Sequence, residues 1–201
     1  MCHGEKPPES RVGLSFGAFR SRLVFADRGF LDLEEWAIGA SFERKISKKV
    51  TAQISGGGIG FARIGGPGAQ TLRGFFLGGG VAWSVIDQKG AIPFVMVGLS
   101  VAASLAVPER GGDDGLYALD IRGSVTAGYT FGKRFTPYAV GRLFGGPVLL
   151  AERGKSFVGT DIYHFQLGVG FVVGLPGGFD LSAELIPLGE QRVSAGLGYS
   201  F

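Results

Sequence analysis

Apolar residues alternate with small or polar residues along most of the chain, and the last eleven residues show this pattern most clearly. One parity of residues 191–201 is apolar and consists of Val193, Ala195, Leu197, Tyr199 and Phe201. The other parity consists of Arg192, Ser194, Gly196, Gly198 and Ser200. Because successive side chains of a strand point to opposite faces, the pattern predicts a strand with one apolar and one small or polar face.

The same alternation recurs along the chain and predicts ten strands. They cover residues 12–18, 35–42, 50–55, 74–85, 92–106, 119–131, 136–144, 163–171, 179–185 and 191–201. The glycine run Gly56–Gly58 is a candidate β-bulge. Residues 90–108 lack charge and are numerous enough for a transmembrane helix, but their period of two and Pro93 near the start favour a strand.

The links between these strands alternate in length, with long links such as 26–33 and 145–160 and tight ones such as 87–90. This alternation predicts an all-β fold, an up-and-down antiparallel transmembrane β-barrel of ten strands, with eight possible. Residues 1–10 read as a disordered tail and residues 11–201 as one barrel domain. A soluble barrel is disfavoured because its outer surface would consist of Gly, Ala and Ser with almost no Lys or Glu.

The closing strand, with its alternating aromatics and its final Phe201, resembles that of small bacterial outer-membrane β-barrel proteins. In that superfamily such an ending is a signal for the barrel-assembly machinery, which implies that role for Leu197, Tyr199 and Phe201. The resemblance implies a Gram-negative outer membrane, with both termini in the periplasm and outer-membrane lipids and lipopolysaccharide as partners. Arg20, Arg22, Arg63 and Arg73 lie near the ends of predicted strands, where they would contact lipopolysaccharide phosphates or form a solvated rim.

Composition supports a membrane barrel and narrows its chemistry. The 201 residues include 37 Gly and 17 Phe, only 18% are charged, and the mean hydropathy is +0.26, which is too apolar for an ordinary soluble surface. The net charge of +3 is scattered, so nucleic acid is not an expected partner. Cys2, His3 and His164 are the only Cys and His residues, and no metal or other cofactor is expected. Cys2 is either lipidated or an ordinary tail residue.

Several charged and polar residues fall on the inward parity of the strands. They are Glu35, Gln53, Asp120, Arg122, Asp180, Glu184 and Arg192, joined by Arg142 if strand 136–144 faces that way. Arg142 shares its parity with Tyr138 and Val140, so the facing of this strand stays open. Charges at membrane depth are costly unless they face inward and pair, so the set forms either a hydrogen-bonded plug or the lining of a narrow solute path.

The pattern therefore favours a structural or adaptor protein, a candidate subunit of a cell-envelope complex. A narrow porin-like path for small solutes or ions is the alternative. A lipid-modifying enzyme is a second alternative, because Asp161, Tyr163 and His164 lie where barrel lipases and lipid A deacylases carry their His and Ser. The deacylase signature places a Ser two residues after the His, where this chain has Gln166, so no catalytic residue is expected.

Overall fold

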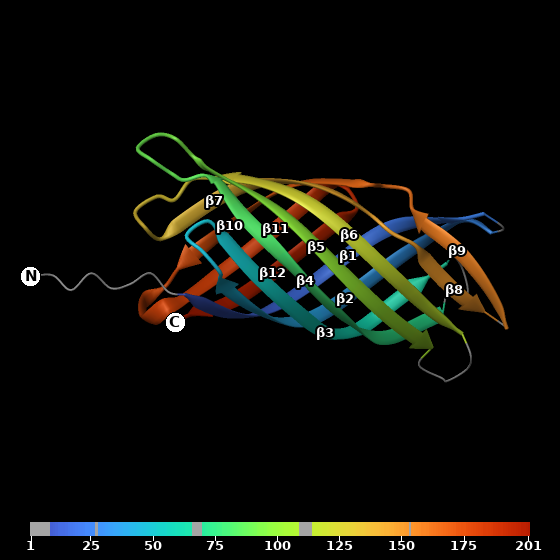
Figure 1. Ribbon diagram of the computed structural model, residues 1–201. Helices are drawn as coiled ribbons and strands as arrows, with labels where there is room; N and C mark the ends of the chain where they lie inside the picture. The colour runs from blue at the N-terminus through green and yellow to red at the C-terminus, as the bar shows by residue number, and fades with distance from the viewer. Residues whose placement is uncertain (1–8, 27, 66–69, 109–113, 153) are drawn as a thin grey trace, which may run out of the picture.

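The computed structural model describes residues 9–26, 28–65, 70–108, 114–152 and 154–201, and it consists almost entirely of antiparallel strands (Figure 1). The strands are β1 (Ser10–Phe25), β2 (Gly29–Lys45), β3 (Val50–Ile64), β4 (Gln70–Ile86), β5 (Phe94–Pro108), β6 (Gly115–Gly128), β7 (Phe135–Gly145), β8 (Val148–Glu152), β9 (Lys155–Asp161), β10 (Phe165–Gly174), β11 (Phe179–Gly189) and β12 (Gln191–Ser200). A single 3-10 turn, Pro176–Gly178, joins β10 to β11. Of the predicted tail, residues 1–8 lie outside the described residues, and Ser10 already belongs to β1.

Ten of the strands close into one barrel, which confirms the predicted fold class. They follow the order β1–β7, β10, β11 and β12, each pairing with its neighbour. The barrel closes where β12 pairs with β1, from Arg11 opposite Ser200 to Arg20 opposite Gln191. Links β2–β3, β4–β5, β6–β7 and β10–β11 and both described chain ends define one end, here called the turn end. No helix in the described part of the chain is long and apolar enough to cross a membrane.

A β-hairpin, β8–β9, occupies most of the segment expected to be the longest loop. Its first strand pairs with β6 along Gly115–Ala118, and its second pairs with β1 along Leu23–Phe25. The hairpin therefore bridges β6 to β1 beyond the ends of β7 and β10–β12, and eight strands close a second ring there. We call this the hairpin end; in Figure 1 it lies opposite the marked termini.

The chemistry of the two faces changes along each long strand, although the alternation continues. In β1, Leu14 and Phe16 face outward and are exposed, whereas Leu23 and Phe25 face inward and are buried. Arg22, which directly precedes Leu23, faces outward. The part of β1 near the turn end thus suits an apolar surrounding, and the part near the hairpin end is built like a soluble barrel.

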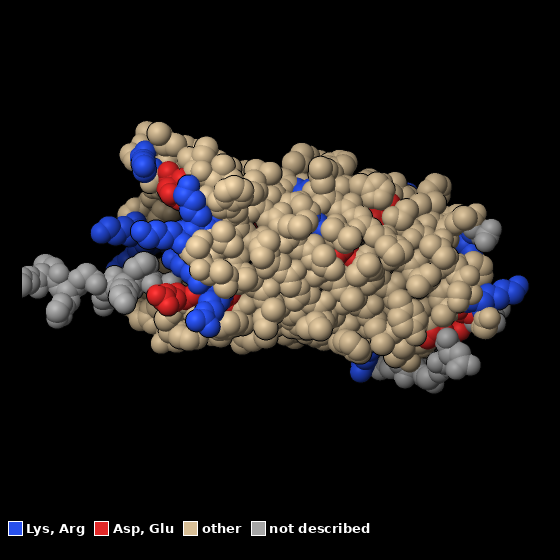
Figure 2. Space-filling view, in the orientation of Figure 1, with Lys and Arg blue, Asp and Glu red and all other residues tan. Residues whose placement is uncertain are grey.

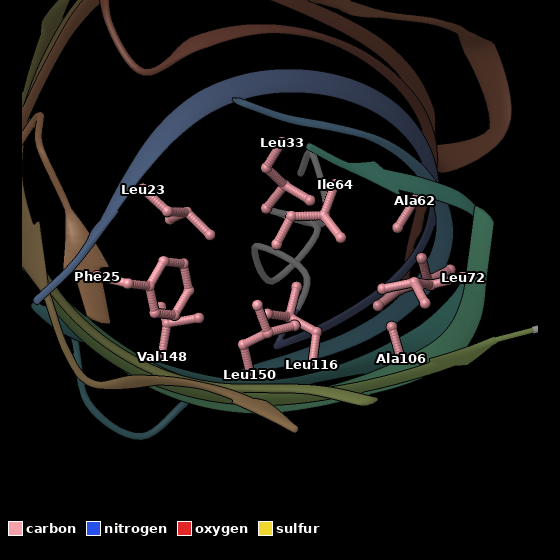
Figure 3. Close-up of a cluster of buried hydrophobic side chains, with 11 residues drawn as sticks. Leu23, Phe25, Leu33, Ala62, Ile64, Leu72, Ala106, Leu116, Val148 and Leu150 are labelled. Carbon is pink, nitrogen blue, oxygen red and sulfur yellow. The ribbon is translucent and has the colours of Figure 1, made fainter. Parts of the chain in front are cut away.

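The hydrophobic core lies inside the hairpin end, where side chains from seven strands converge on the barrel axis (Figure 3). Its buried members are Leu23, Phe25, Leu33, Ile59, Ala62, Ile64, Leu72, Ala106, Leu116, Val148 and Leu150. The β8–β9 hairpin contributes Val148 and Leu150, so it completes both the wall and the core of this end.

Three local features differ from the sequence-based expectations or resolve them. The run Gly56–Gly58 pairs with β2 in unbroken register, and the bulge instead falls at Gly60, against which the Trp36 ring lies. The facing of β7, which the sequence left open, is resolved, because Tyr138, Val140 and Arg142 all face inward without a bulge. The first long link shrinks to residues 26–28, because β1 and β2 extend well beyond their apolar parts.

Candidate functional site

The lumen holds a cavity of about 490 Å³ with two unlike walls. Strands β1–β5 line it mainly with small residues such as Ser15, Gly17 and Ser100, whereas β6, β7, β9, β12 and the β11–β12 turn supply most of the charges. The cavity borders the apolar core through Leu23 and Leu33. The charged groups therefore face a wall of small residues across the cavity and border the apolar core on the hairpin side.

One ion pair joins β7 to β11 across the intervening strand β10. Both guanidinium nitrogens Nη1 and Nη2 of Arg142 on β7 donate to the carboxylate of Glu184 on β11, each at 2.8 Å. The hydroxyl of Tyr138 donates to the same carboxylate at 3.1 Å. The Arg142 and Glu184 side chains are only 17% and 11% exposed, so this is a bidentate pair largely shielded from water.

A second network joins β6, β10 and the β11–β12 turn. Arg122 donates to Asp120 on its own strand at 3.1 and 2.8 Å, and its Nη1 lies 3.4 Å from the amide oxygen of Gln166. The amide nitrogen of the buried Gln166 donates to Glu190, the residue that turns the chain from β11 into β12. The Glu190 carboxylate therefore folds into the barrel, 4.0 Å from Arg122.

A third group of charges lies toward the turn end. Arg11 on β1 donates to Asp180 on β11 at 2.9 and 2.7 Å and to Glu43 on β2 at 2.8 Å. The Arg11–Asp180 contact passes directly over Gly198, where a Cβ atom would overlap both side chains. The glycine thus makes room for an ion pair across the closing strand.

The structure places all seven lumen residues expected from the sequence on the inner face. Asp120, Arg122, Asp180 and Glu184 form ion pairs. Glu35, Gln53 and Arg192 line the cavity, and no side-chain hydrogen bond or ion pair joins them to another residue in the described part of the chain. The charges of Glu190 and Arg192 nevertheless act on Glu35, and those of Arg122, Arg142 and Glu184 act on Arg192. Their functional role stays a prediction.

Sequence reasoning missed Arg11, Glu43, Gln166 and Glu190 as members of the lumen network. Arg11 and Glu43 lie on the inward parity of β1 and β2, beyond the last residues used to define those strands, so extending the alternation would have found them. Gln166 was visible on the non-apolar parity of its strand. Glu190 had no comparable signal, because it lies in a turn, where parity has no meaning.

The four arginines proposed to contact lipopolysaccharide lie outside, on β1, β3 and β4. Two face carboxylates across the β1–β2 pair, with Arg22 Nε 2.7 Å from Asp32 and Arg20 Nε 3.6 Å from Glu34. Arg63 lies opposite Glu34 in register, and Arg73 is exposed on β4. Phosphate binding by Arg20 or Arg22 would therefore compete with a neighbouring carboxylate; the contact itself stays a prediction.

The residues considered for an enzyme, Asp161, Tyr163 and His164, lie where β9 ends and β10 begins. The Ser21 hydroxyl donates a hydrogen bond to the Asp161 carboxylate. His164 is exposed beside Gly145, and Gln166 is buried in the lumen network. Within the described ranges, no hydrogen bond links His164 to Ser21 or Asp161. No group of three or more His, Cys, Asp or Glu residues among the described ones could hold a metal ion.

The C-terminal residues face outward. Leu197, Tyr199 and Phe201 are 43%, 40% and 58% exposed, and the Tyr199 ring lies 4.9 Å from Phe179 and 5.9 Å from Phe201 between centroids. These aromatics form a cluster on the outside of the turn end.

An exposed apolar belt surrounds the barrel, with outward-facing side chains from every strand of the closed ring. Examples, one from each strand, are Leu14, Ile38, Ile54, Leu77, Leu99, Val125, Leu143, Val169, Leu181 and Val193. In a soluble monomer, a belt of this extent would be an aggregation surface, whereas in a bilayer it is the surface that lipid requires.

No protein-family model and no curated protein sequence matches the chain. Solved structures do match. The outer-membrane protease OmpT of Escherichia coli aligns over 100% of this chain and 99% of its own, with a TM-score of 0.55 and 9% identity. The translocator domain of the autotransporter NalP of Neisseria meningitidis aligns over 96% and 88%, with a TM-score of 0.52 and 11% identity. The β-domain of the Bordetella autotransporter BrkA aligns over 96% and 100%, with a TM-score of 0.52 and 15% identity.

Identities this low show a shared fold and nothing of a shared activity. Together with the closed antiparallel ring and the apolar belt, the alignments define the class: the chain is a membrane β-barrel of the bacterial outer-membrane type. Within that class it is a small ten-strand barrel, with an extra hairpin and a core at one end.

Proposed function

We propose that the chain is an integral outer-membrane protein with a closed lumen and a structural or adaptor role, acting as a subunit of a cell-envelope complex. The observation that carries this proposal is the core at the hairpin end. Leu23, Phe25 and Leu72 point into the barrel and are each 1% exposed, so this segment contains packed side chains instead of water. Ions do not cross a dry apolar constriction.

The charged networks below the core add to this closure. Arg122, Arg142 and Glu184 reach into the lumen and are held by partners on other strands or on their own strand. A paired guanidinium in a shielded interior does not leave its partner easily. The wild-type barrel is therefore expected to be non-conducting at rest.

Conductance across a planar bilayer tests the closed lumen. The purified wild-type protein should give no steady conductance, whereas a Leu23→Ser/Leu72→Ser variant should admit water into the core and conduct. Leu14→Ser and Leu77→Ser, which change outward-facing leucines on the same two strands, should stay silent. Steady conductance of the wild-type protein would overturn the closed-lumen proposal.

The second candidate function is a narrow pore for small solutes or ions, and the wet part of the lumen favours it. Ser15 and Gln53 line the cavity and are nevertheless exposed, so water reaches the inner wall. Seven carboxylates and four guanidinium groups face this interior: Glu35, Glu43, Asp120, Asp161, Asp180, Glu184 and Glu190, with Arg11, Arg122, Arg142 and Arg192. If the barrel conducts, it should therefore prefer cations.

The adaptor role is supported by the outer surface of the hairpin end. Tyr117, Leu149 and Val158 form an outward row across β6, β8 and β9, and they are 46%, 42% and 61% exposed. An apolar row on a rigid projecting hairpin suits a protein partner. Copurification from native membranes should recover that partner, and Leu149→Asp/Val158→Asp should release it without loss of the folded barrel. Recovery of the barrel alone from native membranes would contradict the adaptor role.

The remaining parts of the proposal concern location and lipid partners. Both termini would lie in the periplasm with the turn end, and the barrel-assembly machinery would bind the outward face of Leu197, Tyr199 and Phe201. Arg63 and Arg73, together with Arg20 and Arg22, would face lipopolysaccharide at the opposite membrane surface. Their exposure near the hairpin end supports this arrangement.

A further inference from the structure

Seven exposed cations gather at the turn end of the barrel, in or next to three links between strands. They are Arg44, Lys45, Lys48, Lys49, Lys89, Lys133 and Arg134. Figure 2 shows basic side chains crowding this end, with a few acidic ones among them, and few charges along the middle of the same face. None of the seven takes part in an ion pair within the described part of the chain.

The hairpin end treats its cations differently. There Arg20, Arg22 and Arg28 lie beside Glu34, Asp32 and Glu152, respectively. Both ends belong to the same chain, so the overall excess of basic residues does not explain why their cations differ. Arg63 and Lys155 at the hairpin end also lack an ion pair among the described residues, but only the turn end gathers seven such cations, and these are available to an external anion.

Hydrogen bonds hold these turns in place and join two of them. The Ser47 hydroxyl accepts from the backbone N–H of Lys49 and Val50, at 3.3 and 3.2 Å, which shapes the β2–β3 turn. Gln88 in the β4–β5 link exchanges two hydrogen bonds with the backbone of Thr130 in the β6–β7 link. The cations of these two links are thus displayed on one continuous surface.

The β6–β7 turn keeps a lysine where the backbone disfavours it. Gly132 and Lys133 have φ values of 55° and 62°, and the Arg134 N–H donates to the Phe131 carbonyl at 3.1 Å, as in a type I′ turn. Lys133 is the only residue other than glycine with a positive φ among those described. Gly or Asn would suit this position better, so local turn chemistry does not explain the lysine.

Exposed aromatic and aliphatic side chains show where this surface lies relative to a bilayer. The outward aromatics of the turn end include Trp83, Tyr129, Phe131, Tyr199 and Phe201. Such aromatics mark the boundary between the acyl chains and the headgroups. Ile46 and Ile92, which are 64% and 56% exposed, project from the same turns as Lys45 and Lys89. The cations therefore lie at the level of lipid phosphates.

We propose that the turn end binds the phosphate headgroups of anionic phospholipids in the leaflet on its side of the membrane. This inference rests on the proposed membrane location but not on the closed lumen. An acidic protein would also attract seven cations, but the protruding isoleucines and the spread over three turns suit a lipid surface better. Each Lys or Arg near an anionic membrane strengthens binding by about fivefold at low salt.

The test uses the full chain in phosphatidylcholine nanodiscs, titrated with short-chain phosphatidylglycerol and followed by native mass spectrometry. The wild-type protein should bind phosphatidylglycerol well above added phosphatidylcholine, with an affinity that falls as salt rises. Lys48→Gln/Lys49→Gln should weaken binding by at least about tenfold. Arg28→Gln/Lys155→Gln, which removes two cations from the hairpin end, should leave it unchanged.

Lys133→Gly separates lipid binding from folding. It removes one cation and places a glycine at the positive φ that disfavours lysine. Thermal stability in pure phosphatidylcholine should therefore stay the same or rise, while phosphatidylglycerol binding falls. Equal losses in the turn-end and hairpin-end variants, or binding that ignores salt, would overturn the proposal. It would also be overturned if Lys48→Gln/Lys49→Gln released an acidic protein from native membranes without weakening phosphatidylglycerol binding.

Discussion

Individual residues in the lumen are stabilised mainly by partners on other strands. Arg142 and Glu184 are far apart in sequence but form a bidentate pair, shielded from water by the barrel wall. A buried charge is tolerable only while its partner remains, so the cost of breaking such a pair is much larger than its net contribution.

Arg142→Met should destabilise the barrel by about 3 to 5 kcal/mol, because it leaves the Glu184 carboxylate shielded and unpaired. Arg142→Met/Glu184→Gln should recover part of that loss. Arg22→Met, which breaks the exposed pair with Asp32, should lower the free energy of unfolding far less. Urea unfolding of detergent-refolded protein measures all three, and similar values for Arg142→Met and Arg22→Met would contradict the buried pair.

A second residue-scale prediction concerns Gly198. An added methyl would displace Arg11 from Asp180, so Gly198→Ala should cost about 1 to 3 kcal/mol through loss of a charge-assisted hydrogen bond. Gly123→Ala is the matched control, because its nearest neighbour in that direction, the Leu143 carbonyl, is 4.0 Å away. The same unfolding assay applies, and equal stability of the two variants would show that Arg11 and Asp180 do not need the glycine.

At the scale of elements, the β8–β9 hairpin decides how the barrel ends. It supplies two of the buried core residues and the only strands that join β6 to β1 at that end within the described ranges. A change that unfolds the β8–β9 hairpin should therefore disrupt both the buried core and the ring of strands at the hairpin end.

Leu150→Ala should destabilise the protein by about 2 to 4 kcal/mol, because a buried leucine side chain is replaced by a cavity. Leu149→Ala, on the neighbouring residue of the same strand, faces outward and should change the free energy of unfolding by less than about 1 kcal/mol. Heat-modifiability on gels and urea titration provide the comparison. If Leu149→Ala proved the more harmful change, the assignment of inward and outward faces in β8 would be wrong.

At the scale of the whole molecule, the two ends of the barrel differ enough to predict which end faces the periplasm. The turn end has compact links and both described chain ends, whereas the hairpin end projects a structured wall beyond the apolar belt. Barrels of this class keep their turns in the periplasm.

In a Cys2→Ser background, Lys155→Cys should react with an impermeant thiol reagent on intact cells, because Lys155 lies at the tip of the β8–β9 hairpin. Lys89→Cys, in the β4–β5 link, should react only after the outer membrane is permeabilised. Labelling of Lys89→Cys but not of Lys155→Cys on intact cells would reverse the proposed orientation.

The sequence by itself determined the strands and most of their facing, because alternation is a local property that any strand expresses. All ten predicted strands exist, and the inward parity of residues such as Asp120 and Glu184 followed from it. The alternation of apolar and polar residues did not predict which face is apolar at the hairpin end. Leu23 and Phe25 keep the inward parity of Gly13 and Gly17, but the apolar face now points inward, and so the core at the hairpin end was not foreseen.

Only the tertiary structure decided which residues pair and how the barrel is closed. Arg122 could have paired with Asp120 or Glu184, and the register of β6, β7 and β11 assigned it to Asp120 and assigned Glu184 to Arg142. The β8–β9 hairpin became a wall because the edges of β6 and β1 were free to accept it. Such choices depend on strand stagger and on contacts between distant segments, neither of which leaves a local trace in the sequence.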